Sequence, residues 1–524
     1  MALDSDTSTQ DAKMATNGQK EDAVAVSEAG GKAVSFSTDA AGAPVGGVGA
    51  GSTSVTSGQQ PAASEDADST AVTSGQQPAA SEDEARKMAV IDAGYKRLCS
   101  DATLQTKKDG YFMTFDSQVI QSVPESQFEE FKQLKTDEER IFFVWNLPPV
   151  HSIIKVRPFC RNKSAKAAED TKQAGNQLFQ QKRYRQAVCQ YSQSVVRAPP
   201  PGHDDEGDLL SIGFANRSAA LLHMGEYALC LRDITAALAA GYPARLRYKL
   251  LDRRATCQLK LGEVTASRGT LQELKTALTV ADLNEKKMAA WQKDLQNKMD
   301  TTSKMQDCKP IMLQAELEQP APPPLPSRSG HFVSASAAVD VAHAAGEGRY
   351  AVAAQHVQPG DVLVVEKPHA SVLMAEKMST HCLHCLKRVL AAFPCAACSG
   401  VVFCSPECAA AATYHRWECT ILDLLQASGM SVLCHLALRL VTRHSMQFFR
   451  ELRPELEKRR DPTVRPCTDT EGHTFDPSSY LAVHQLVTLG ELRKPEDFFH
   501  RTLMAVLLLK HLRVTGYFGE LPGG

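Results

Sequence analysis

The sequence has no excess of either charge and no long apolar run. Its 524 residues carry 58 Lys and Arg against 60 Asp and Glu, a formal net charge of -2. Broad binding to nucleic acid needs a clear basic excess, so this composition argues against it. No apolar stretch approaches the roughly 18 residues of a transmembrane helix, and the polar N-terminus lacks the pattern of a secretory signal. We therefore expect a cytoplasmic and nuclear protein whose cysteines are reduced thiols.

Aromatic side chains are scarce and are almost missing from residues 1–85. This segment consists mainly of Ala, Gly, Ser, Thr and Gln, and the string VTSGQQPAASED occurs in it twice, from Val55 and from Val72. A short duplication without an apolar face cannot bury enough surface to offset chain entropy. We expect a disordered tail that carries no chemistry.

Helical and strand patterns divide the remainder, which is too long for a single compact core. Thr136 and Glu139 form a capping box ahead of an apolar run. Amphipathic helices are expected from Ile421 to Phe518, and residues 503–512 (LMAVLLLKHL) are expected to be the most buried among them. The turn Pro359-Gly360 precedes a predicted strand at 361–365. The fold class is expected to be mostly α with a small α+β part.

Residues 175–195 (GNQLFQQKRYRQAVCQYSQSV) closely match the helical-hairpin template of tetratricopeptide (TPR) repeats. In this match Gly175 allows two helices to pack closely, Tyr184 begins the second helix, and Tyr191 fills the groove between them. Residues 216–238 form a second copy and residues 252–274 a looser third. The small-residue anchors of the copies are 43 and 37 residues apart, against a usual spacing of about 34. We expect an array of helical hairpins.

Seven of the 15 cysteines lie between Cys382 and Cys419, and this clustering indicates metal. With one histidine they supply the eight thiolate or imidazole donors that two tetrahedral zinc ions need. The Cys-x2-Cys pairs suit tight knuckles, and each of the two i,i+4 pairs can present two ligands from one helical turn. Buried free thiols are the competing interpretation and fit this regular array poorly, while His381 and His384 are alternative donors. The predicted ligands are Cys382, Cys385, Cys395, Cys398, Cys404, Cys408, His415 and Cys419.

This string resembles the MYND finger throughout, including the aromatic residue Phe403 before the fifth ligand. The resemblance implies two structural zinc ions with alternating ligand pairs. MYND fingers generally bind short Pro-rich peptides, which makes Trp417 a candidate contact, although packing is the preferred interpretation of that residue. By the resemblance, one ion would be bound by Cys382, Cys385, Cys404 and Cys408, and the other by Cys395, Cys398, His415 and Cys419.

One TPR subgroup binds a C-terminal carboxylate in the groove lined by the first helix of each repeat, and this chain resembles it at all five clamp positions. Two pairs among these residues are spaced i,i+4 and share a helix face. Together the five would meet the two carboxylates of a terminal Asp through charge-assisted hydrogen bonds. The resemblance implies a partner ending in Glu-Glu-Val-Asp, as heat-shock chaperones do; a solvated basic helix face is the alternative. The clamp residues are Lys172, Asn176, Asn216, Lys249 and Arg253.

Residues 346–373 resemble the opening strands of a SET domain. There a glycine-containing turn lets backbone amides approach S-adenosylmethionine, and the matching residues are Gly348 and Arg349, with Tyr350 in place of the second glycine. The Asn-His-Ser-Cys strand and the late tyrosine of SET catalysis are missing from this sequence, so no catalytic residue is assigned. We expect a C-terminally truncated form, and an ordinary hairpin turn is the alternative for residues 348–350.

Together these motifs identify the chain as a member of the SET and MYND domain-containing family, in its TPR-bearing branch. The resemblance implies a protein-lysine N-methyltransferase that uses S-adenosylmethionine, has a SET β-fold interrupted by the finger, and binds chaperone tails; truncation would leave this chain inactive. The alternative is a non-enzymatic adaptor that joins chaperones to Pro-rich partners. The expected divisions are a disordered tail (1–85), a helical segment (86–166), TPR-like repeats (167–305), a Pro-rich linker (306–329), the first part of SET (330–381), the MYND finger (382–419) and a SET-associated helical segment (420–524).

Overall fold

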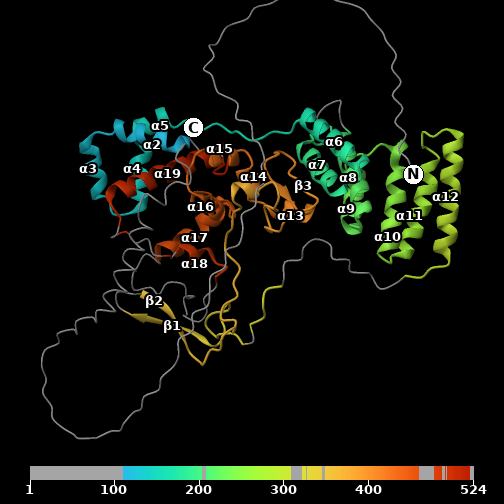
Figure 1. Cartoon of the computed structure of the whole chain (residues 1–524). Coiled ribbons are helices and arrows are strands. Elements are labelled where there is room, and N and C mark those ends of the chain that lie inside the picture. The colour runs from blue at the N-terminus through green and yellow to red at the C-terminus, as the bar shows by residue number, and fades with distance from the viewer. Residues whose placement is uncertain are drawn as a thin grey trace, which may run out of the picture. The chain divides into compact units, whose positions relative to one another are not determined.

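The computed structural model describes residues 110–202, 208–307, 321–325, 327–344, 348–458, 477–484, 486, 490 and 493–519. The described chain is mostly helical, with two small two-stranded sheets, as the sequence predicted (Figure 1). The predicted disordered tail at 1–85 and most of the Pro-rich linker lie outside the described residues. Within the described part, no helix combines the length and the apolar character needed to cross a membrane.

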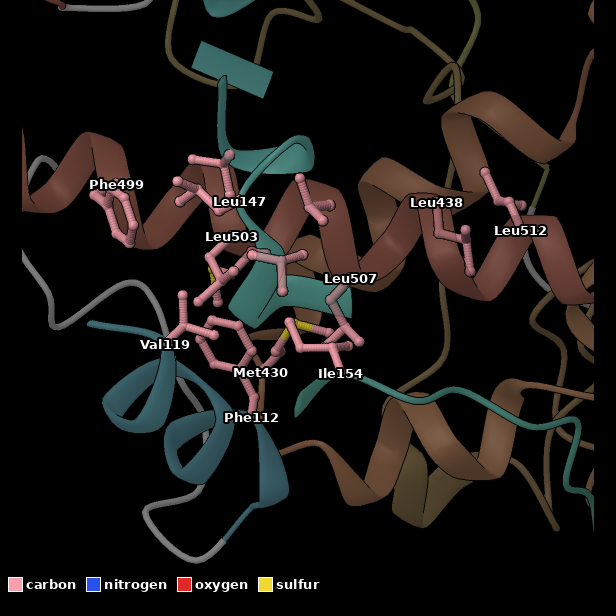
Figure 2. Close-up of a cluster of buried hydrophobic side chains, with 14 of the residues drawn as sticks. Phe112, Val119, Leu147, Ile154, Met430, Leu438, Phe499, Leu503, Leu507 and Leu512 are labelled. Atoms are coloured by element: carbon pink, nitrogen blue, oxygen red, sulfur yellow. The ribbon is translucent and has the colours of Figure 1, made fainter. Parts of the chain in front are cut away.

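Helices from the two ends of the described chain share one hydrophobic core. Phe112 packs in the same cluster as Leu503 and Leu507, and Figure 2 shows side chains from both ends directed into it. The sequence predicts 86–166 and 420–524 as separate segments. An amphipathic helix must bury its apolar face against another element, and here the helices of the two segments bury their apolar faces against each other. These helices are α2 (Tyr111–Ser122), α3 (Glu125–Gln133), α4 (Asp137–Trp145), α5 (Pro148–Ile153), α15 (Leu422–Ala427), α16 (Val432–Thr442), α17 (Met446–Lys458) and α19 (Pro495–Val514). The short helix α18 (Tyr480–His484) contributes no residue to this cluster.

Two local predictions in this core are confirmed. The Thr136 hydroxyl accepts a hydrogen bond from the Glu139 amide at 3.2 Å, and the Glu139 carboxylate accepts one from the Thr136 amide at 2.9 Å. This reciprocal capping box begins α4, as predicted. Helix α19 buries most of the predicted apolar segment 503–512, including Leu503 and Leu507.

Three consecutive helical hairpins follow, in which α6 packs on α7, α8 on α9 and α10 on α11 (Figure 1). The first hairpin confirms the predicted roles of its residues. Helix α7 begins at Tyr184, and a Cβ atom placed on Gly175 would lie 2.6 Å from the Tyr191 ring, so only glycine permits this helix contact. The helices are α6 (Ala165–Gln180), α7 (Tyr184–Arg197), α8 (Leu209–Met224), α9 (Tyr227–Ala239), the 3-10 helix η2 (Ala244–Leu246), α10 (Arg247–Lys260), α11 (Val264–Leu278) and a seventh α-helix, α12 (Glu285–Ser303).

The β-structure is smaller than the sequence suggests. Strands β1 (Val339–Ala344) and β2 (Gly348–Ala353) form an antiparallel hairpin. The predicted strand at 361–365 contributes only an isolated bridge between Val364 and Ala335. Within the Cys-rich segment, β3 (Phe393–Pro394) pairs with β4 (Val402–Phe403), and the short helices η3 (Ala375–Lys377), α13 (Pro406–Ala411) and α14 (His415–Glu418) complete the described elements.

We predict that Gly175→Ala destabilises the protein, since the added methyl group must displace the Tyr191 ring. Overpacking of this kind costs about 1–3 kcal/mol. Gly269→Ala is the matched control, because a Cβ at this exposed helical glycine would meet nothing within 4 Å, and the change should stabilise α11 by about 0.5–1 kcal/mol. Urea unfolding followed by helical circular dichroism measures both. Equal stability of Gly175→Ala and the parent would contradict the packing described.

Candidate metal centres and peptide groove

The structure brings the eight predicted metal donors together as two separate groups of four. Within each group all donor atoms lie within 4.8 Å of one another. The grouping is the alternating one that the MYND resemblance implies, and His381 and His384 belong to neither group. The first group is Cys382, Cys385, Cys404 and Cys408, and the second is Cys395, Cys398, His415 and Cys419.

The donor separations fit a tetrahedral zinc ion. With zinc–sulfur bonds of about 2.3 Å, two sulfurs of one tetrahedron lie about 3.8 Å apart, and a sulfur and an imidazole nitrogen about 3.5 Å apart. In the first group the Cys404 sulfur lies 3.6 Å from that of Cys385 and 3.4 Å from that of Cys408. In the second, the His415 Nε2 lies 3.6 Å from the Cys398 sulfur. Each group could therefore hold one zinc ion.

Burial makes a bound cation important for the ionisation of these thiols. Burial raises the pKa of the Cys408 thiol to about 11. A divalent cation at the centre of the group favours the thiolate and reverses this effect. The imidazole of His415 directs Nε2 at the sulfurs, and its buried Nδ1 has no partner among the described residues.

The backbone around the donors differs in one respect from the sequence prediction. His415 and Cys419 do lie on one helical turn, because the Cys419 amide donates to the His415 carbonyl at 2.7 Å. The prediction was wrong for Cys404 and Cys408. Cys404 directly follows strand β4, whereas Cys408 lies in α13, whose N-cap is the intervening Ser405. The serine hydroxyl satisfies the Cys408 amide, and this favours a new helix start between the two donors.

A fully buried carboxylate anchors the helix that carries two donors of the second group. Glu418 lies between His415 and Cys419 in sequence, and its two oxygens accept bidentate hydrogen bonds from Arg439 of α16 at 2.6 and 2.7 Å. Burial alone would raise the pKa of Glu418, but hydrogen bonds from Arg439 and His435 outweigh it and lower this pKa to about 2. Arg439 also donates to the Ser371 carbonyl at 2.8 Å. Sequence analysis missed this pair, because its members are 21 residues apart and share no motif.

Trp417 is a packing residue in this structure. Its ring meets the Tyr517 ring edge-on at 5.4 Å, and Arg416 stacks over it at 4.1 Å. The side chain packs against the helical core that contains α19. This agrees with the preferred interpretation and leaves the tryptophan unsuited as a main peptide contact.

The five predicted clamp residues lie on the first helices of the three hairpins, two on α6, one on α8 and two on α10. The structure brings two of them into contact, since the Asn216 side-chain amide donates to Asn176 Oδ1 at 3.1 Å. Arg253 reaches across to α8, where its Nη1 donates to the Ala215 carbonyl at 2.9 Å. All five are partly buried: Lys172, Asn176, Asn216, Lys249 and Arg253.

Burial disfavours the charged forms of the two clamp residues on α10, Lys249 and Arg253. It lowers the pKa of Lys249, and the neighbouring Arg253 and Lys287 lower it further. Burial likewise lowers the pKa of the Arg253 guanidinium. At the α6 end, Lys172 instead pairs with Glu169 at 2.6 Å. A carboxylate ligand near α10 would therefore relieve repulsion between cations.

The three predicted cofactor residues lie at the start of strand β2. Gly348 pairs with Ala344 across the hairpin, and Tyr350 pairs with Ala342. The Tyr350 side chain is 43% exposed. This placement fits an ordinary hairpin and does not by itself form an enclosed cofactor site.

The helical hairpins and the two four-donor groups define the class, a mostly helical protein with two groups of residues that could each hold a metal ion. No protein-family model matches the chain. The chain is 35% identical over 293 residues to protein-lysine N-methyltransferase SMYD4 of Pongo abelii, which covers 51% of this chain and 35% of the relative. Its identity to the Gallus gallus protein of the same name is 30% over 399 residues, covering 68% of this chain and 52% of the relative. Histone-lysine N-methyltransferase ASHR2 of Arabidopsis thaliana is 39% identical over 98 residues, 17% of this chain and 24% of the relative.

The chain belongs to the SET and MYND domain-containing protein-lysine N-methyltransferase family. Both SMYD4 relatives represent the fourth member of that family. The chain spans between about a third and about half of the length of these two SMYD4 relatives. Among solved structures, the first TPR of Spaghetti (RPAP3) bound to the HSP90 peptide SRMEEVD aligns with 27% of this chain and 94% of its own, at 18% identity and a TM-score of 0.21. A likeness of this size does not establish the fold of the hairpins.

We predict that Arg439→Met destabilises the protein and accelerates metal release from the second donor group. The change leaves the Glu418 carboxylate buried without its main partner, which costs about 3–5 kcal/mol. Arg443→Met, at an exposed position near the end of the same helix, is the matched control. Urea unfolding and the rate of zinc transfer to a coloured chelator measure the two effects. If both variants release zinc at the parental rate, Glu418 and Arg439 do not position the donor helix.

Proposed function

We propose that this chain carries two structural zinc ions in its Cys-rich finger and binds acidic C-terminal tails of heat-shock chaperones in the groove of its helical hairpins. The supporting observation for the groove is the placement of all five clamp residues on the first helices of the hairpins, with Asn176 and Asn216 in contact. First helices of TPR hairpins line the concave face, so these side chains would point at one ligand.

The hydrogen bonds around Asn176 favour a carboxylate ligand. Its Oδ1 accepts from Tyr191 at 2.8 Å and from Asn216 at 3.1 Å. Both acceptor directions of this oxygen are thus used, which leaves the Asn176 amide group as a donor. An amide donor between lysines and an arginine is suited to the two carboxylates of a terminal aspartate.

The cations at the two ends would contribute differently. Lys172 must exchange its Glu169 partner for the ligand, so its net contribution is reduced by the pair that it loses. Among the described residues Lys249 has cationic neighbours, Arg253 and Lys287, and no ion pair, so a bound carboxylate would give it a counter-charge. We therefore assign the larger electrostatic share of tail binding to the α10 end of the groove.

The zinc ions are assigned a structural role because each four-donor group is complete. Four protein ligands fill a tetrahedron and leave no open position for substrate or water. Binding of the metal then contributes folding free energy, and chelation is expected to unfold the finger.

We also propose methyl transfer, on the basis of relatives of whose length this chain spans between about a third and about half. The names of the relatives support a protein-lysine N-methyltransferase that uses S-adenosylmethionine, in which a neutral lysine amine attacks in line with the sulfonium. The S-adenosylmethionine-binding site would include Gly348, Arg349 and Tyr350. The alternative is a non-enzymatic adaptor; the packed Trp417 gives a Pro-rich partner of the finger no support.

Calorimetry with S-adenosylmethionine separates these two proposals. If β2 forms part of the cofactor site of a methyltransferase, S-adenosylmethionine gives a heat of binding with the parent chain and none with Arg349→Ala. No heat with the parent chain favours the adaptor for this polypeptide. A heat that Arg349→Ala leaves unchanged would mean that the cofactor binds elsewhere.

We predict that Lys249→Ala weakens binding to a peptide ending in Glu-Glu-Val-Asp by roughly 10- to 150-fold, because one charge-assisted hydrogen bond contributes about 1.5–3 kcal/mol. Lys172→Ala should weaken binding less. Lys166→Ala is the matched control, since this lysine is exposed on α6 outside the predicted clamp set. Fluorescence anisotropy with a labelled peptide measures all three. Unchanged affinity in Lys249→Ala would leave the hairpins as a scaffold without this ligand.

A further inference from the structure

We propose that the zinc finger forms part of the folded core of the first two hairpins, so that metal binding in the finger controls the order and the tail affinity of the groove. The proposal rests on the zinc and tail binding proposed above. It arises from contacts between residues 386–394, the finger segment between two predicted zinc ligands, and helices α7, α8 and α9.

The apolar part of this contact is shared core. Ala391 is fully buried and belongs to the same hydrophobic cluster as Val195 of α7 and Ile234 of α9. Phe393 packs against that cluster and lies 6.1 Å from the ring of Phe214 in α8. The hairpins therefore need this segment in place to complete their own packing.

The polar part of the contact joins two arginines of the second hairpin to carbonyl groups of the same segment. Arg217 of α8 is fully buried and pairs with Asp233 of α9 through Nε at 2.7 Å and Nη2 at 2.8 Å. Its Nη1 donates to the Ala392 carbonyl at 2.7 Å. Arg232 of α9 donates to the Ala391 carbonyl at 2.7 Å and also to the carbonyl of Cys404, a predicted zinc ligand.

The segment is attached to one metal group at each end. It follows Cys385 of the first group and ends before Cys395 of the second. Without metal, both attachments are expected to loosen. Nη1 of Arg217 then loses the Ala392 carbonyl and keeps the Ser192 hydroxyl, to which it donates at 3.0 Å. Arg217 keeps its pair with Asp233, but the cluster around α8 also loses the packing of Ala391 and Phe393, so we expect α8 to rearrange.

A rearrangement of α8 would reach the groove directly. The clamp residue Asn216 is adjacent to Arg217 in sequence and lies on the same helix. Its contact with Asn176 is the only contact between clamp residues of different helices among the described hydrogen bonds. Loss of zinc is therefore expected to disrupt the α6 and α8 parts of the clamp.

A second contact ties the metal groups to the start of the first hairpin. Ser399, next to the ligand Cys398, donates through its amide to the Arg161 carbonyl at 2.8 Å, and Asn162 forms a β-bridge with Cys398. These residues lead into α6, which carries Lys172 and Asn176. We therefore expect metal binding to stabilise the first hairpin as well as the second.

Helices α11 and α12 provide an internal reference. With one face of α10 they form a separate cluster, of residues such as Tyr248, Leu271 and Leu295, that includes no finger residue. The opposite face of α10, with Leu250 and Cys257, belongs to the cluster that contains Ala391, so α10 is left out of the reference. If the coupling follows the contacts described, α7 and α8 lose order when zinc is removed, while α11 and α12 keep theirs.

The test uses the full chain, loaded with two zinc equivalents or stripped by a chelator. Hydrogen–deuterium exchange is expected to show loss of amide protection in α7 and α8 and unchanged protection in α11 and α12 on zinc removal. The affinity for a peptide ending in Glu-Glu-Val-Asp should fall at least about 5-fold. Unchanged protection of α7 and α8, or an equal loss in α11 and α12, overturns the proposal.

The two proposals fail in different ways. If zinc-loaded chain does not bind the peptide, tail binding is wrong, while hydrogen exchange still tests whether the finger orders the hairpins. If α7 and α8 lose protection but peptide affinity is unchanged, the link from the finger to the groove is wrong.

A variant at the contact between finger and hairpins tests whether Arg232 links zinc binding to the order of α8. Arg232→Gln removes the charged donor to the two finger carbonyls and should reduce the zinc dependence of α8 protection while two zinc ions remain bound. Arg185→Gln, at an exposed position on α7, is the matched control. Full zinc dependence in Arg232→Gln would exclude this arginine as part of the connection.

Discussion

The arrangement of the finger depends on eight thiol and imidazole donors that lie in two groups of four, each of which could hold one divalent cation. The finger has a small core, and some of the residues that form it, including Cys382, Cys398 and Cys419, are themselves donors. Four cysteine sulfurs held within 4.8 Å of one another cannot all ionise without a cation, because like charges at this distance repel. A bound cation removes that repulsion and allows one small cluster to position loops from residue 382 to residue 419.

The finger is placed by buried ion pairs on two sides. On one side Arg217, paired with Asp233 inside the hairpins, donates to the Ala392 carbonyl in the segment between two predicted ligands. On the other, Glu418, within a ligand-bearing turn, pairs with Arg439 of the helical core. Such pairs contribute little net stability compared with apolar packing, but they fix one arrangement, because any other leaves a charge buried alone. The finger therefore connects the hairpins to the helical core.

Local signals in the sequence were sufficient for much of this structure. The eight donors are recognisable from spacing, the capping box from Thr136 and Glu139, and the first hairpin from Gly175 and Tyr191. What could not be predicted depends on contacts distant in sequence. Nothing near Phe112 indicates that it packs with Leu507, and nothing near Arg217 indicates that it reaches Ala392.

Two failures of prediction have local causes that can be recognised in retrospect. Ser405 is a good N-cap, and Pro406 suits the first turn of a helix, so the helix begins between Cys404 and Cys408 and does not include both. Arg217 and Asp233 are charged residues in otherwise apolar helices, NRSAALL and LRDITAAL. Charges in such positions are buried only when paired, and this was the available signal for a polar contact inside the hairpin.

The central claim is that two zinc ions bind in these two donor groups. Zinc content combined with X-ray absorption at the zinc edge tests it most directly on the purified full chain. We predict two zinc ions per chain with seven sulfur ligands and one nitrogen ligand between them, matching the two groups, at zinc–sulfur distances of about 2.3 Å. A single zinc ion per chain, or oxygen ligands in place of sulfur, would contradict the account.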